Sequence, residues 1–78
     1  MKLMVLYTKH AEDMLLERKI QRSLIELAIK QPDSSYIDDS GLAHLFKTIE
    51  EKVLRVVARR ENNTYIIITM YYDRRMKK

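Results

Sequence analysis

KVLRVVARRENNTYIIITMYY, residues 52–72, is the stretch that decides the fold. Its two halves, residues 52–60 and 64–72, are both rich in β-branched and aromatic residues, which is typical of β-strands. Only ENN separates them, and Asn tolerates the left-handed backbone that a tight hairpin turn requires. We therefore expect these two runs to pair directly as antiparallel strands.

The neighbouring segments extend this sheet. The run LAHLFKTI, residues 42–49, has the same strand-like composition and is joined to the hairpin by the short linker EE. The segment PDSSYIDDSG, residues 32–41, contains Pro, Ser, Asp and the only glycine, which indicates turns around at most one short strand. The C-terminal half thus predicts an antiparallel meander of three or four strands.

The N-terminal part predicts two short helices. In TKHAEDMLLERKI, residues 8–20, Thr8 can cap a helix whose apolar residues recur at helical spacing. Ser23 and Glu26 have the spacing of a capping box for a second helix, and Pro32 ends that run. We expect an α+β domain in which the two N-terminal helices pack on a three- to four-stranded antiparallel β-sheet.

Length and composition limit the class of protein. A chain of 78 residues fits one domain of minimal size, and 46% hydrophobic with 33% charged residues is typical of a globular protein. No apolar run approaches the roughly 18 residues of a membrane span, and MKLMVLY lacks the cleavage site of a signal peptide. The absence of cysteine removes disulfides and thiolate metal sites. We expect a cytoplasmic protein with no membrane partner.

The net charge of +4 comes entirely from the C-terminal end. Residues 1–73 carry eleven Lys/Arg and eleven Asp/Glu, so the surplus belongs to Arg74, Arg75, Lys77 and Lys78. We therefore divide the chain into one compact domain, residues 1–73, and a basic tail, residues 74–78. Such a tail can bind nucleic-acid phosphates or simply keep a small protein in solution.

The period of two sorts the strand residues between the faces of the sheet. The all-apolar sets should face the helices, and they are Leu54, Val56 and Ala58 in one strand and Ile66, Ile68, Met70 and Tyr72 in the next. The opposite face then carries Arg55, Arg59, Tyr65, Ile67, Thr69 and Tyr71. Arginine and tyrosine on a sheet face can bind phosphates and stack on bases, so this face is a candidate RNA surface. The same residues also fit the solvated side of a two-layer sheet.

The spacing of His, Asp and Gly in the sequence does not indicate a metal or cofactor site. His10 and His44 lack the spacing of zinc motifs, and Asp38 and Asp39 stand in no EF-hand pattern. One glycine cannot form a Gly-rich phosphate loop. We expect neither a metal nor a cofactor.

Histidine, arginine and tyrosine are the residue types that remain for chemistry. Cleavage of RNA by its own 2′-OH needs a base for that hydroxyl, cations for the charge on the phosphate and an acid for the leaving oxygen. His10 can be the base or the acid, since histidine titrates near neutral pH. Arg18, Arg55 or Arg59 can hold the phosphate, and Tyr71 can orient it or donate a proton.

Both histidines also have a purely structural interpretation. A lone histidine in the first turn of a helix, such as His10, is more often a surface residue than a catalytic one. His44 lies on an expected strand with no partner visible in the sequence, and we expect it to be structural.

KHAEDMLLERKI, residues 9–20, resembles the first-helix signature of a small bacterial and archaeal family, domain of unknown function 4258. In that signature a His-Ala pair is followed by Glu-Arg-x-Ile, and the matching residues are His10, Ala11, Glu17, Arg18 and Ile20. AIKQPD, at the end of the second expected helix, and YIIITMY, with Thr69 and Tyr71, resemble later parts of the family pattern. The resemblance covers almost the whole chain in element order.

This resemblance implies an activity and a partner. The family is thought to be related to the RelE-like and BrnT-like toxins, which are metal-independent ribonucleases of toxin–antitoxin systems. It implies an endoribonuclease toxin that acts on RNA, free or on the ribosome, and is neutralised by a small antitoxin protein. The residues expected to be catalytic are His10, Arg18, Arg55 and Tyr71. The residues expected to bind RNA are Arg59, Thr69, Arg74, Arg75, Lys77 and Lys78.

Two positions depart from the family pattern. Met14 stands where the family usually has arginine, which removes one candidate phosphate ligand. Lys19 stands where the family usually has glycine, so Lys19 must adopt a backbone conformation that glycine adopts more easily, or the corner must differ slightly.

Two other functions fit the same residues. A non-catalytic RNA- or protein-binding module would use the same sheet face and the basic tail. A structural homodimer would cover Val53, Val57 and Ile67 of that face with a second copy.

Overall fold

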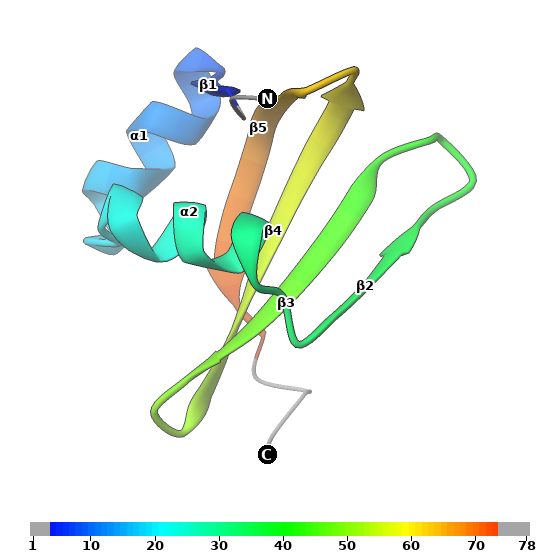
Figure 1. The fold of residues 1–78 in the computed structure, drawn as a ribbon. Helices are drawn as coiled ribbons and strands as arrows, with labels where there is room; N and C mark the ends of the chain where they lie inside the picture. Colours follow the sequence, from blue (N-terminus) through cyan, green and yellow to red (C-terminus); the bar gives the residue numbers. More distant parts are fainter. Residues whose placement is uncertain (1–3, 74–78) are drawn as a thin grey trace.

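The computed structural model describes residues 4–73 (Figure 1). In chain order the elements are β1 (Met4–Tyr7), α1 (Lys9–Arg18), α2 (Arg22–Lys30), β2 (Ser34–Ile37), β3 (Ala43–Ile49), β4 (Lys52–Glu61) and β5 (Thr64–Tyr72). The α+β class and the two N-terminal helices are therefore confirmed.

The sheet has five strands in the order β1-β5-β4-β3-β2. Strands β2 to β5 form the expected antiparallel meander, but β1 pairs with β5 in parallel, so the sheet is mixed. The expectation of three or four antiparallel strands was wrong in this respect. Four residues are too few to show an alternating pattern, and MVLY becomes a strand because the edge of β5 offers it a backbone ladder.

The last two turns of the meander each use a non-glycine residue in the left-handed region. Asn62 has φ 57° in the β4–β5 turn, as its type predicted, and Glu50 has φ 59° between β3 and β4. Asparagine reaches this region at low cost, so the β4–β5 hairpin is locally encoded.

The two helices begin differently. The Thr8 hydroxyl accepts a hydrogen bond from the Ala11 N–H (3.0 Å), which confirms the predicted cap of α1. At α2, Gln21 is the cap residue and makes no side-chain capping bond, while the Ser23 hydroxyl donates to the Gln21 side chain (3.4 Å). The predicted Ser23–Glu26 capping box was therefore wrong, because the helix begins two residues earlier than that motif requires.

An irregularity in β5 changes the predicted faces of its first half. Val57 pairs with Thr69, but the next residue, Ala58, pairs with Ile67, so Ile68 is an extra residue on β5. Met70 and Tyr72 face the helices as predicted, whereas Ile67 and Tyr65 were wrongly assigned to the other face. Ile67 is 0% exposed and lies in the core with the helices.

Both helices cover one face of the sheet (Figure 1). The core lies between the two layers and is formed by Ala11, Leu15, Ile20, Ile25, Ala28, Ile29, Ala43, Leu45, Leu54, Val56, Ala58, Ile67 and Met70. No helix within residues 4–73 covers the other face, which we call the open face. None of the helices in this range is long and apolar enough to cross a membrane.

Candidate functional site

Arg55 is at the centre of the open face. It lies in the middle of β4, where Phe46 of β3 and Tyr71 of β5 are its cross-strand neighbours. Its Nη1 donates to the Tyr71 hydroxyl (2.9 Å), and its Nη2 donates to the hydroxyl of Tyr36 on β2 (2.9 Å). One guanidinium thus links three strands of the sheet.

The surroundings of Arg55 keep it charged. Partial burial opposes the charged form, but the hydrogen bond that Arg55 donates to Tyr71 and the electrostatic effects of Tyr71, Tyr36 and Asp73 outweigh it, so the pKa of Arg55 is raised. Its guanidinium carbon lies 4.7 Å from the centre of the Phe46 ring, and its Nη1 lies 3.5 Å from Asp73 Oδ2. The cation is therefore fixed in place rather than free in solvent.

Arg55 keeps hydrogen-bonding capacity despite these contacts. A guanidinium has five N–H donors. The two tyrosine hydroxyls use one donor on each terminal nitrogen, and a second Nη1 donor faces Asp73. The second N–H of Nη2 remains for another acceptor, and the Nε–H is buried without a partner among residues 4–73.

Arg18 joins this cluster from the helix layer. It is the last residue of α1, and its guanidinium carbon lies 5.9 Å from the centre of the Tyr71 ring. It reaches the open face because β1 ends at Tyr7, opposite Ile67, which leaves the second half of β5 without a neighbouring strand on that side. The structure thus brings together three of the four residues expected to be catalytic, Arg18, Arg55 and Tyr71.

His10 is not part of this cluster. It is exposed in the first turn of α1, and its side chain makes no hydrogen bond, ion pair or ring contact with residues 4–73. Eight residues of helix separate it from Arg18, which is about 12 Å along the axis. His10 therefore lies apart from the cluster around Arg55.

The residues expected to bind RNA are spread over the chain. Thr69 is on the open face opposite Val57, two pairs along the ladder from Arg55. Arg59 is on the same face but four residues along β4, exposed, with its Nη1 4.0 Å from Glu61 Oε2. Arg74, Arg75, Lys77 and Lys78 lie outside the described residues.

Sequence reasoning missed a second polar group on the open face. His44 of β3 and Tyr36 of β2 are cross-strand neighbours whose rings stack in parallel, with centres 4.6 Å apart and planes 1° apart. His44 Nε2 is 2.7 Å from Asp38 Oδ2. The sequence shows each residue, but only the β2–β3 register brings them together.

Asp38 organises the turn beside this pair. Its Oδ1 accepts hydrogen bonds from the backbone N–H groups of Ser40 (2.9 Å) and Leu42 (3.0 Å). The hydrogen bond with His44, followed by those with Leu42 and Ser40, outweighs desolvation and lowers the pKa of Asp38. The carboxylate is therefore ionised at neutral pH and holds both the turn and His44.

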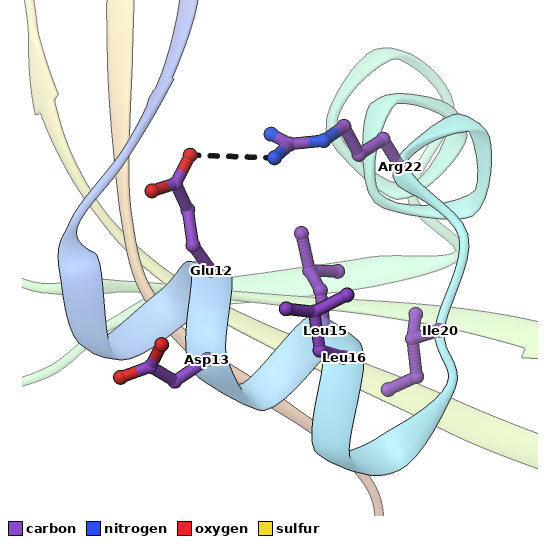
Figure 2. Close-up of a pocket in the computed structure, with 6 residues that line it drawn as sticks. All are labelled: Glu12, Asp13, Leu15, Leu16, Ile20 and Arg22. Carbon is purple, nitrogen blue, oxygen red and sulfur yellow. Dashed lines mark hydrogen bonds and ion pairs between the residues drawn. The ribbon is translucent and has the colours of Figure 1, made fainter.

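The molecule also has a hollow between α1 and α2, on the helix layer (Figure 2). It measures about 380 Å³ and is lined by Glu12, Asp13, Leu15, Leu16, Ile20 and Arg22. Glu12 and Arg22 form an ion pair of 3.3 Å across it, and Leu16 is 80% exposed. None of its lining residues belongs to the cluster around Arg55, so it is a separate feature.

Residues 4–73 contain no group of three or more His, Asp or Glu side chains that could hold a metal ion. The family model described as Domain of unknown function (DUF4258) matches residues 7–72. No curated protein and no solved structure matches the chain.

Proposed function

The chain belongs to the family described as Domain of unknown function (DUF4258), and we propose that it is a metal-independent endoribonuclease of a toxin–antitoxin system. In this proposal it is related to the RelE-like and BrnT-like toxins, acts on RNA in the cytoplasm, and is neutralised by a small antitoxin protein. The observation that supports it most is the position of Arg55, which two tyrosine hydroxyls hold on the open face beside Arg18.

The arrangement suits charge stabilisation during phosphodiester cleavage. The 2′-OH of RNA gives its proton to a base and attacks the adjacent phosphorus, and the bond from phosphorus to the 5′ oxygen breaks. Negative charge grows on the non-bridging oxygens and then on the leaving 5′ oxygen, which takes up a proton. Arg55 has one Nη2 hydrogen to offer, and Arg18, which is exposed, supplies a second cation. Fixed cations of this kind need no reorganisation during the reaction, which is the main way that a site without metal accelerates phosphoryl chemistry.

Two residues compete for the proton-transfer role. The Tyr71 hydroxyl accepts a hydrogen bond from Arg55 and keeps its own proton, which it can donate to an oxygen of the bound phosphate. Histidine is the residue type most often used as an acid or base, but His10 lies about 12 Å along α1 from Arg18. In this proposal Tyr71 acts at the phosphate, because its hydroxyl is hydrogen-bonded to Arg55, and His10 has no direct part in the proton transfer.

The test is cleavage of RNA in EDTA, with and without ribosomes, followed by mapping of the new ends. We expect wild-type protein to produce ends with a 2′,3′-cyclic phosphate, and Arg55→Gln and Tyr71→Phe to reduce the rate by at least about 100-fold, the range for loss of a charge-stabilising or proton-transfer group. His10→Ala separates the two proton-transfer assignments. Arg60→Gln is the matched control, since it removes the same charge from an exposed arginine on the other face of β4.

Absence of cleavage by folded wild-type protein under both conditions would refute the ribonuclease proposal. The second candidate is then RNA binding without cleavage by the same face. The stacked rings of Tyr36 and His44 on this face favour it, because an exposed aromatic ring can bind a base without any catalytic group. The homodimer alternative loses support, because Ile67 is in the core and Val53 and Val57 are already buried within one chain.

A further inference from the structure

We propose that Tyr36 is a stacking platform for one base of single-stranded RNA, next to the phosphate that Arg55 holds. The platform consists of Tyr36 with His44 behind it, and Asp38 fixes His44. This inference rests on the proposed function, since it assumes that RNA reaches the open face. It adds a binding site for the base to a site that so far contacts only the phosphate.

Tyr36 is the aromatic residue that solvent reaches most easily. Among the aromatic residues in 4–73 it is the only exposed one, at 47%, and it lies on the edge strand β2. Phe46, two residues along the same face from His44, is 4% exposed and cannot take a base. An exposed ring gains by stacking on a nucleobase, which removes apolar surface from water.

The ring of Tyr36 is held in one orientation. It stacks in parallel on His44, the Phe46 ring lies 6.0 Å away at an interplanar angle of 22°, and the Tyr36 hydroxyl accepts a hydrogen bond from Arg55 Nη2 at 2.9 Å. His44 in turn is fixed by Asp38 at 2.7 Å. Because the ring does not have to be ordered on binding, more of the stacking free energy appears as affinity.

The same geometry makes His44 a positioning residue. Its Nε2 is occupied by Asp38, and its Nδ1 is buried without a partner among the described residues. Neither nitrogen is therefore exposed to exchange a proton with RNA. His44 acts through Tyr36, whose ring it supports.

Arg55 and the Tyr36 ring are close enough for one nucleotide to contact both. The Arg55 guanidinium carbon lies 5.9 Å from the centre of the Tyr36 ring, a gap that the sugar between a phosphate and its base can bridge. A base can stack on Tyr36 only if it has left a duplex, so the platform selects single strands. Stacking tolerates every base, so we expect little preference among base types.

The test compares two eight-nucleotide 2′-O-methyl RNA strands of equal charge, one with adenine throughout and one abasic. Methylation removes the nucleophile, so binding is measured without cleavage. We expect wild-type protein to bind the adenine strand more tightly than the abasic strand. Tyr36→Ser should weaken binding of the adenine strand by about 5- to 150-fold, the range for one stacked base, and leave the abasic strand almost unchanged.

Two variants and one probe make the result specific. Tyr36→Phe keeps the ring and loses the bond to Arg55, so the preference for the adenine strand should remain. Ile37→Ser is the control, because Ile37 is 63% exposed on the same strand but faces the other way. In wild-type protein, 2-aminopurine within the strand should be quenched on binding, a readout that needs no variant.

The outcomes separate this proposal from the one it rests on. Equal binding of the adenine and abasic strands by wild-type protein, without quenching of 2-aminopurine, refutes the platform and leaves phosphate binding by Arg55 intact. Binding of neither strand refutes both the platform and the RNA-binding basis of the proposed function.

Discussion

Replacement of Lys19 by glycine should stabilise the protein. Lys19 follows the last residue of α1 with φ 56° and ψ 44°, in the left-handed region. Its N–H points to the Leu16 carbonyl (3.4 Å), and the Ile20 N–H donates to the Leu15 carbonyl (3.0 Å). These two bonds, with Leu15 and Ile20 both in the core, form the Schellman ending that glycine favours.

The size of the effect follows from this geometry. A side chain with a Cβ loses roughly 1–2 kcal/mol in the left-handed region. Glycine loses about 0.5–1 kcal/mol more backbone entropy on folding. The difference favours Lys19→Gly by roughly 0.5–1 kcal/mol, which for a domain of this size corresponds to a rise in Tm of about 2–8 °C.

Thermal and urea unfolding followed by circular dichroism measure this change. Lys19→Ala is the matched control, because it removes the same charge and keeps the Cβ, so it should melt close to wild type. Glu17→Gly, an exposed position within α1, should destabilise by roughly 0.5–1 kcal/mol, because glycine is unfavourable inside a helix. A Lys19→Gly protein that melts at or below Lys19→Ala would show that the reasoning about this corner is wrong.

Further predictions concern the pH dependence and the charges around Arg55. Because folding lowers the pKa of Asp38 below its ordinary 3.8, this carboxylate stabilises the fold above that pH, and the stabilisation is lost as the pH falls through the lower folded value. Between about pH 6 and pH 2, the Tm of Asp38→Asn should therefore fall less steeply with decreasing pH than the Tm of wild type. Asp73→Asn should tighten binding of the 2′-O-methyl strands, because it removes the carboxylate 3.5 Å from Arg55, and weaker binding would contradict this. Arg55→Gln should reduce the slope of log affinity against log salt concentration by about 0.7, the value for one phosphate contact on a single strand. Truncation after residue 73 should reduce that slope further if the tail contacts phosphates, and an unchanged slope would exclude such contacts.

The hairpin and most of its faces could be predicted because β4 alternates clearly. Arg55 and Arg59 alternate with Val53 and Val57 on one face, so only one assignment of faces keeps the two arginines out of the core. The first half of β5 could not be assigned in the same way. Residues 65–68 are apolar at every position, so a shift of one residue leaves the pattern unchanged, and the extra residue Ile68 is invisible in the sequence.

The candidate site, too, could be predicted from the sequence only in part. Arg55 and Tyr71 are cross-strand neighbours in the hairpin that could be predicted, and the structure places them within hydrogen-bonding distance. Tyr36 and Asp38 lie in a segment whose turn residues indicate a loop, and their contacts with Arg55 and His44 depend on the register of a four-residue strand. No periodicity can establish such a register, so this half of the site needed the structure.

Arg55 can serve both the fold and a ligand because its contacts use separate hydrogens. Nη1 joins β4 to Tyr71 on β5, and one hydrogen of Nη2 joins it to Tyr36 on β2. The second hydrogen of Nη2 can reach a phosphate without breaking either tyrosine bond. Rigid strands then hold the cation, and the same hydroxyls that fix it position Tyr71 for proton donation and Tyr36 for stacking. Loss of Arg55 should therefore disturb both the phosphate site and the base platform. Tyr36→Ser should mainly remove the platform, because Tyr71 and Asp73 still hold Arg55, and Tyr71→Phe should mainly remove the proton donor, because Tyr36 still holds Arg55.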